Sequence, residues 1–193
     1  MRKKIKLIIG LFLICSLFSS LIMATPKYDV QNKGLIYGLI DLSDTNYFLS
    51  DIFFLEYPEK IPGKKKIFFK TLSSDIIWKN GLFVFTKIPP GKYILAYFRL
   101  EKYGYSLEPV VECWIPTPQL KESVPFTVKA GEICYYGSYK YITVQKAKLF
   151  SKEKFDLEKT DSFSRKELLQ KLLTNLGGTD WEAKINQELS KMR

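Results

Sequence analysis

The chain has 193 residues, a formal net charge of +10 and no histidine. The missing histidine excludes Ser-His-Asp and Cys-His catalytic groups and removes the commonest zinc ligand. Because no G-x-S-x-G, phosphate-loop or calcium-loop pattern occurs either, we predict a non-enzymatic protein with no catalytic residue, cofactor or metal. Acid pairs such as Asp41/Asp44 could serve a glycosidase, but a chain with 20 acidic residues offers such pairs by composition alone.

Residues 1–24 predict an export signal. A basic opening, Arg2-Lys3-Lys4-Ile5-Lys6, precedes an apolar run from Leu7 to Ala24, after which the composition turns polar. This layout is typical of a secretory signal peptide that is cleaved after Ala24. Because the run of 18 residues reaches the lower limit for crossing a bilayer, an uncleaved membrane anchor is the main alternative.

A further alternative makes Cys15 the lipidated residue of a bacterial lipoprotein. The preceding residue is Ile14, where such signals need a small residue, and the apolar stretch continues beyond Cys15. The sequence therefore favours Cys15 as an ordinary residue of the apolar core of the signal peptide.

Removal of the leader leaves 169 residues, a suitable size for one domain with its own core. The remaining 26 basic and 20 acidic residues give a net charge of +6, which favours anionic surfaces such as phospholipid headgroups or cell-wall polymers. Nucleic acid is not an expected partner, because the chain has no basic helix or known binding signature.

From Gly34 to Val144, short segments rich in β-branched and aromatic residues alternate with turn residues. The expected strands cover residues 34–42, 51–57, 67–70, 82–87, 92–100, 108–114, 125–128 and 133–144. About seven to eight short strands in this arrangement predict a mainly β fold, an antiparallel β-sandwich over residues 25–145.

Residues 164–193 predict two helices. Ser164 and Glu167 form a capping-box pattern, leucines follow at helical spacing, and Gly177-Gly178 ends the first helix. Thr179 and Glu182 repeat the capping pattern before a second helix. The apolar stripe of that helix consists of Trp181, Ile185, Leu189 and Met192. Residues 146–163 are expected to form a charged connector between the sandwich and the helical pair.

The strands on either side of Pro89-Pro90-Gly91 have no polar face. Leu82 and Val84 should lie opposite Phe83 and Phe85, and the next strand is equally apolar on both sides. In that strand, Ile94, Ala96 and Phe98 should share one face, and Tyr93, Leu95 and Tyr97 the other. We therefore expect the two C-terminal helices to bury their stripes on one sheet face, the alternative being a partner protein or an oligomer interface.

The run Asn80-Gly81-Leu82-Phe83-Val84-Phe85, followed by Ile88-Pro89-Pro90-Gly91-Lys92-Tyr93, resembles the carboxypeptidase regulatory-like, transthyretin-type sandwich domains. The likeness covers about residues 34–100 and is most specific over residues 80–95. It implies an Ig-like sandwich of seven strands that serves as a structural or binding accessory. The interval of 25 residues between Asp41 and Lys66 and the appended helices depart from that family.

Two groups of residues are candidates for binding. Tyr135, Tyr139 and Tyr141 alternate along one expected strand face, where exposed rings could stack on sugar or protein, although tyrosine also favours strands in general. The second group is Lys64, Lys65 and Lys66, a basic loop tip that could contact an anionic polymer or lipid. Such runs also serve to protect the edge of a sheet.

Cys113 and Cys134 remain after removal of the leader. An oxidising compartment would permit a disulfide between them, and closing this loop contributes roughly 3 kcal/mol in the chain-entropy model. The alternative is two separate thiols that behave as small apolar residues.

Together these features predict an exported, non-catalytic binding or assembly module of a bacterial cell envelope. Its partner would be an envelope protein or a glycan, and peripheral membrane contact fits the charge. One alternative is a carbohydrate- or cell-wall-binding protein that uses the tyrosine face. The other is a structural protein tethered to the membrane through residues 7–24 or a lipidated Cys15.

Overall fold

The computed structural model describes residues 28–56, 71–73, 76–78, 80–102, 111–114, 125–145 and 154–192. Within them, seven strands have four or more residues, three strands are shorter, and two helices follow. The strands are β1 (Gly34–Asp41), β2 (Tyr47–Glu56), β3 (Thr71–Ser73), β4 (Ile76–Ile77), β5 (Leu82–Ile88), β6 (Gly91–Lys102), β7 (Val111–Trp114), β8 (Phe126–Val128), β9 (Ile133–Gln145) and β10 (Lys154–Lys159). The helices are α2 (Arg165–Leu176) and α3 (Glu182–Ser190).

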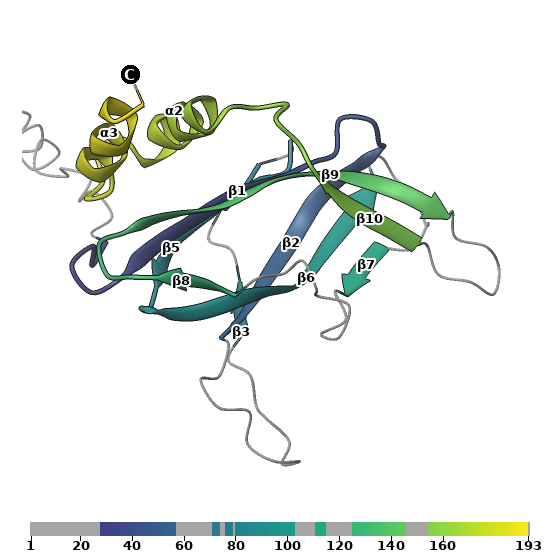
Figure 1. Ribbon diagram of the computed structural model, residues 1–193, viewed down its shortest axis with the longest axis horizontal. Coiled ribbons are helices and arrows are strands. Elements are labelled where there is room, and N and C mark those ends of the chain that lie inside the picture. Colours follow the sequence, from purple (N-terminus) through teal and green to yellow (C-terminus); the bar gives the residue numbers. More distant parts are fainter. Residues whose placement is uncertain are drawn as a thin grey trace, which may run out of the picture.

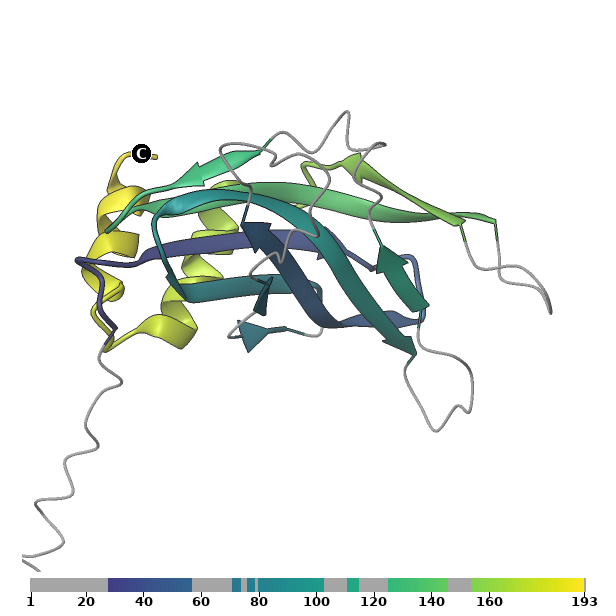
Figure 2. The same ribbon diagram turned by 90° about the horizontal axis from the view of Figure 1, so that it is seen from below.

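The strands form two sheets that face each other, which confirms the predicted sandwich. Sheet A has the order β10-β9-β1-β5-β4, and sheet B has the order β3-β2-β6-β7 with β8 also paired to β6. The pairings are antiparallel except for β1 and β9, which run parallel. Figures 1 and 2 show the two helices at one end of the molecule, on the side of sheet A that faces away from β2 and β6.

An aromatic-rich core fills the space between the two sheets. Phe83 and Phe85 of β5 meet Phe54 of β2 there, with ring centroids 6.1 and 5.1 Å from that of Phe54. Leu95 and Phe98 of β6 close the core from sheet B and are fully buried. These tilted and edge-on ring pairs are the arrangements that aromatic quadrupoles favour.

A second core lies between sheet A and the helices. Sheet A contributes Leu35, Tyr37, Leu39, Leu82, Val84 and Ile133. The helices contribute Leu168, Leu169, Leu172, Leu176 and Ile185, and Trp181 joins them from the position just before α3. The helices therefore cover the outer face of sheet A, as their leucine stripes predict, and the fold has three layers. Burying an aliphatic or aromatic side chain of this size contributes about 1.5 to 3 kcal/mol.

The two helix starts differ from each other. Ser164 and Glu167 form the predicted capping box, with the Glu167 N–H donating to Ser164 Oγ at 3.2 Å and the Ser164 N–H donating to Glu167 Oε2 at 2.7 Å. The repeated box at the second helix is a wrong prediction, because α3 begins after Trp181 with no side-chain cap. Glu182 instead accepts the backbone N–H of Gly178 at 2.6 Å, one residue before the expected position.

Asn80 and Gly81 form a turn that requires glycine at its second position. Gly81 has a φ of +86°, and a Cβ at this position would lie 1.8 Å from the carbonyl oxygen of Ile40. The turn packs closely because the Ile40 N–H donates to the Gly81 carbonyl at 3.1 Å. A side chain would therefore force the turn away from β1.

The segment around Pro89-Pro90-Gly91 joins the two sheets instead of closing a hairpin within one. β5 belongs to sheet A and pairs with β1 and β4, whereas β6 belongs to sheet B. The helices consequently cover β5 and leave β6 to the sandwich core. The predicted faces of β6 are also wrong, because a β-bulge near Ala96 brings Phe98 to the same inner face as Leu95.

The sandwich also extends beyond the predicted boundary at residue 145. Residues 154–159 of the expected connector form β10, which pairs with β9. Phe155 and Leu157 pack against the aromatic core, while Lys154, Asp156 and Glu158 are exposed. This period-two alternation is the strand signal that the high charge of the segment obscured.

The packing of α2 on sheet A makes a direct prediction for stability. Leu172 is fully buried between the helix and the sheet. Leu172→Ala should lower the free energy of unfolding by about 2 to 5 kcal/mol, because the substitution leaves a cavity in the second core. Urea unfolding measures this, with Gln170→Ala on the exposed side of the same helix as the control. Equal stability of the two variants would show that the helix does not pack there.

Candidate functional site

The predicted row of exposed tyrosines does not exist in the structure. β9 has an irregularity at Tyr136, where Tyr37 aligns with Tyr135 and Gly38 aligns with Gly137. The extra residue reverses the alternation, so Tyr135 packs against the helix-side core whereas Tyr141, 2% exposed, lies in the sandwich core. The Tyr139 ring lies 5.5 Å from that of Tyr136, which packs against the sandwich core. The glycan-binding alternative therefore loses the face on which it depended.

Of the other predicted site residues, the structure describes some and leaves others outside its described ranges. Lys64, Lys65, Lys66, Cys15 and the leader 1–24 lie outside the described residues. Cys134 is a free thiol in sheet A, with its sulfur 4.0 Å from the Thr127 carbonyl oxygen, so the structure contains no disulfide between it and Cys113 of β7. Burial raises the pKa of Cys134 to about 11, which keeps the thiol protonated and unreactive at neutral pH.

A polar network joins the helices to sheet A beside the second core. Arg165 Nε donates to the hydroxyl of buried Tyr37 at 3.1 Å, and Arg165 Nη2 lies 3.4 Å from Glu188 of α3. The Arg165 guanidinium also lies over the Tyr135 ring, 5.8 Å from its centroid. Burial raises the pKa of Tyr37 to about 12, with Arg165 opposing that shift. Tyr37 is therefore a neutral hydrogen-bonding partner at pH 7, and the network holds α2 and α3 in place.

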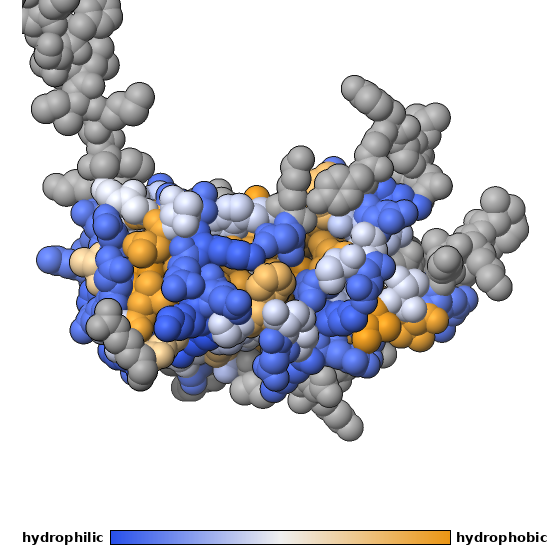
Figure 3. Space-filling view, turned by 90° about the horizontal axis from the view of Figure 1, so that it is seen from above, coloured by the Kyte–Doolittle hydropathy of each residue, from blue (hydrophilic) through white to orange (hydrophobic). Residues whose placement is uncertain are grey.

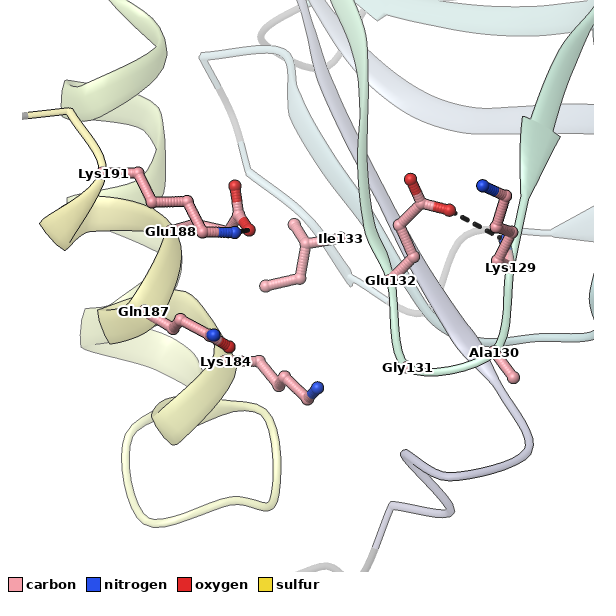
Figure 4. A pocket seen from close by; sticks show the side chains of 9 residues that line it. All are labelled: Lys129, Ala130, Gly131, Glu132, Ile133, Lys184, Gln187, Glu188 and Lys191. Carbon is pink, nitrogen blue, oxygen red and sulfur yellow. Dashed lines mark hydrogen bonds and ion pairs between the residues drawn. The ribbon is translucent and has the colours of Figure 1, made fainter.

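Next to this network, a pocket of about 380 Å³ opens between α3 and the turn from β8 to β9. It is lined by Lys129, Ala130, Gly131, Glu132, Ile133, Lys184, Gln187, Glu188 and Lys191. In Figure 4, Lys184 and Gln187 extend from α3 towards the turn, with Ile133 between the two walls. The pocket has an apolar floor, because Ile133 belongs to the second core, and a charged rim.

Some charged side chains of the pocket form ion pairs with other described residues, and others do not. Glu188 forms ion pairs with Lys191, at 2.5 Å, and with Arg165. Glu132 accepts the backbone N–H of Lys129 at 3.2 Å. Within the described part of the chain, the ammonium groups of Lys129 and Lys184 have no carboxylate within ion-pair distance. The arrangement therefore suits an anionic group.

Sequence reasoning missed this pocket, although it identified both of its walls. Residues 129–132 separate the expected strands 125–128 and 133–144, and Lys184 immediately precedes Ile185 of the predicted helix stripe. A lysine next to a buried stripe lies at the edge of the surface that the helix buries. The position of Lys184 is therefore the sequence feature that could have indicated the pocket. What the sequence does not show is that the turn and α3 lie side by side.

Asp41 is a second polar group held by specific partners. Its carboxylate accepts hydrogen bonds from the Ser43 N–H at 3.0 Å and from Ser162 Oγ at 2.9 Å. Burial by itself would raise the pKa of Asp41, but these hydrogen bonds and the nearby charge of Lys140 together lower it below the ordinary value of 3.8. Asp41 thus joins the end of β1 to the segment that leads into α2.

The described residues contain neither a metal-binding cluster nor a helix that could span a membrane. No group of three or more Cys, Asp or Glu side chains in the described ranges could hold a metal ion, and neither described helix is long and apolar enough to cross a membrane. Family models, curated proteins and solved structures contain no match to this chain. The resemblance to carboxypeptidase regulatory-like domains stays a prediction.

The contact between Asp41 and Ser162 predicts a pH-dependent stability. Because the folded-state pKa of Asp41 is lowered, its contribution is present above about pH 4 and is lost as the pH falls through the folded value. Ser162→Ala should lower the free energy of unfolding by about 1 kcal/mol at pH 7 and by less under acid conditions. Denaturant unfolding across this range measures the effect. Ser190→Ala on α3 is the control, and a loss independent of pH would contradict the assignment.

Proposed function

We propose that the chain is an exported, non-catalytic binding or assembly module of a bacterial cell envelope. The observation that carries this proposal is that Tyr28, close after the predicted cleavage site, is attached to the domain. The Tyr28 N–H donates to Asp180 at 2.8 Å, and Lys87 Nζ lies 5.6 Å from the centre of the Tyr28 ring. The chain is thus fixed to the domain four positions after Ala24, and cleavage after Ala24 would remove none of the described residues.

The ionisable groups with shifted pKa values support a role in binding over one in catalysis. Burial raises the pKa of Tyr37 and of Tyr93 to about 12 each, and both hydroxyls donate to or accept from fixed partners. Asp41 is held by Ser43 and Ser162 within the fold. These three shifts therefore have structural causes, whereas a catalytic group needs a free position facing a substrate.

The surface is consistent with an independent module that offers a local binding site. Among the described residues, Val144 is the one large apolar side chain that is exposed, at 64%. Figure 3 looks onto the face that carries the helices and shows a largely hydrophilic surface interrupted by narrow apolar strips. The apolar stripes of both helices are buried on sheet A. They therefore do not form an exposed surface for a partner protein or an oligomer interface.

Export can be tested in a bacterial host by fractionation and by the mass of the intact protein. The wild-type chain should leave the cytoplasm and begin at Thr25. Leu13→Arg should remain in the cytoplasm at full length, because a charge in the apolar run opposes insertion. Ser190→Arg, which adds the same charge on exposed α3, should be exported normally.

The same mass distinguishes the anchored forms. A membrane-bound chain that begins at Met1, or a lipid-modified chain that begins at Cys15, would support envelope location with a tether. A full-length wild-type protein in the cytoplasm would contradict the proposed function.

A further inference from the structure

The row beside β9 in sheet A is filled along only part of that strand. β10 pairs with β9 from Tyr139 to Gln145, and the Thr160 N–H then donates to the Ser138 carbonyl at 3.0 Å. After Thr160 the chain leaves the sheet and enters α2. Figures 1 and 2 accordingly show β10 beside the half of β9 that lies away from the helices. Residues 133–137, the open stretch of β9, therefore have β1 on one side and no described strand on the other.

Two residues of the open stretch direct their backbone groups away from β1. The Leu35 N–H of β1 donates to the Glu132 carbonyl at 2.9 Å, and Leu35 aligns with Ile133. In a parallel ladder this contact turns the backbone groups of residues 132 and 134 to β1 and those of Ile133 and Tyr135 to the opposite side. Among the described residues, no backbone contact from that side reaches Ile133 or Tyr135. Two N–H donors and two carbonyl acceptors are thus available for another chain.

The open stretch lacks the features that protect the outer edge of β10. On that edge Lys154, Asp156 and Glu158 are exposed, and Asp156 Oδ1 accepts the Leu157 N–H at 2.8 Å. The open stretch reads Ile-Cys-Tyr-Tyr-Gly and contains neither a charged residue nor a proline. Charged side chains discourage pairing at a sheet edge, whereas an uncharged edge is a template for an added strand. The open stretch is therefore the better position for strand addition.

The pocket beside α3 borders the open stretch. Ile133 lines the pocket and belongs to the second core, and Figure 4 shows its side chain between α3 and the turn of residues 129–132. In paired strands, residues directly opposite each other share a face of the sheet. The side chain opposite Ile133 in an added strand would therefore lie on the face that α3 covers, where the pocket provides about 380 Å³.

The charges of the pocket favour an acidic side chain at this position. Lys184 on the wall formed by α3 has no carboxylate within ion-pair distance among the described residues. Glu188 on the same wall is paired with Lys191 and Arg165. Glu132 accepts the backbone N–H of its own turn, and Figure 4 shows its carboxylate on the side of the turn away from α3. Lys184 is thus the unpaired charge on the side of the pocket formed by α3.

We propose that an extended segment of a partner protein pairs with Ile133 and Tyr135 of β9 and directs an acidic side chain to Lys184. This inference names the class of partner for the binding role proposed above and rests on that role. Main-chain hydrogen bonds hold the added strand, and the pocket selects one of its side chains. The apolar floor at Ile133 receives the stem of that side chain, and Lys184 pairs with its carboxylate.

Amide hydrogen exchange of the purified full chain, followed by NMR, tests the backbone contact. The probe is a blocked heptapeptide, Thr-Val-Thr-Glu-Thr-Val-Thr, and the control peptide has Lys in place of Glu. In the free chain the amides of Ile133 and Tyr135 should exchange quickly, whereas that of Cys134, which faces β1, should be protected. The glutamate peptide should slow exchange at Ile133 and Tyr135. The lysine peptide should bind about fivefold more weakly, because it loses one partly exposed ion pair.

Reversal of the charge at Lys184 tests the selected side chain. Lys184→Glu should bind the lysine peptide more tightly than the glutamate peptide. Lys166→Glu makes the same change at an exposed position of α2 and should keep the preference of the wild-type chain.

Three results would overturn the proposal. In the first, neither peptide slows exchange at Ile133 and Tyr135. In the second, those amides are already protected in the free chain, and protection rises with chain concentration, which would assign the edge to a second copy. In the third, Lys184→Glu keeps the wild-type preference, which would remove the acidic side chain from the pocket.

The failure of this proposal is distinguishable from that of the proposed function. Peptide binding is measured on the purified chain and does not depend on export. A wild-type chain retained in the cytoplasm would contradict the envelope role and leave the peptide result unchanged, whereas absent protection would remove the added strand and leave the export result unchanged.

Discussion

The fold depends on the burial of β1 and β5 on both of their faces. All eight residues of β1 are buried, with Ile36 and Ile40 in the aromatic core and Leu35, Tyr37 and Leu39 under the helices. A sandwich of two sheets covers only one of these faces. The outer face needs a third layer, because exposed apolar area of this size opposes solubility and favours association. The helical pair supplies that layer by covering the outer face of sheet A.

Trp181 links the layers and positions the pocket. Its side chain is fully buried, and its indole N–H donates to the carbonyl of Thr86 in β5 at 3.1 Å. This contact fixes the start of α3 over sheet A, while Arg165 joins the two helices to Tyr37. The lysine-lined pocket therefore exists only when α3 is packed, since α3 forms one of its walls. The pocket and the second core therefore both depend on the packing of α3.

The layers of the fold could be predicted from the sequence, but the alignment of neighbouring strands could not. The prediction of a sandwich with helices on one sheet face was correct. It depended on the apolar residues on both faces of residues 82–85 and on the leucine spacing after Ser164. The tyrosine face failed because one extra residue at Tyr136 reverses the alternation, and bulges have no strong local signal. The pocket could not be predicted, because the contact between residues 129–132 and α3 is made by tertiary packing alone.

Deletion of residues 164–193 tests most directly the claim that the helical pair completes the core of the domain. The truncated chain would expose Leu35, Leu39 and Val84 of sheet A to water. We expect it to aggregate, or to lack a cooperative unfolding transition, under conditions in which the full chain is soluble and unfolds in one step. A soluble, monomeric truncated chain that unfolds cooperatively in urea would contradict the account, because the outer face of sheet A would then be stable without its helices.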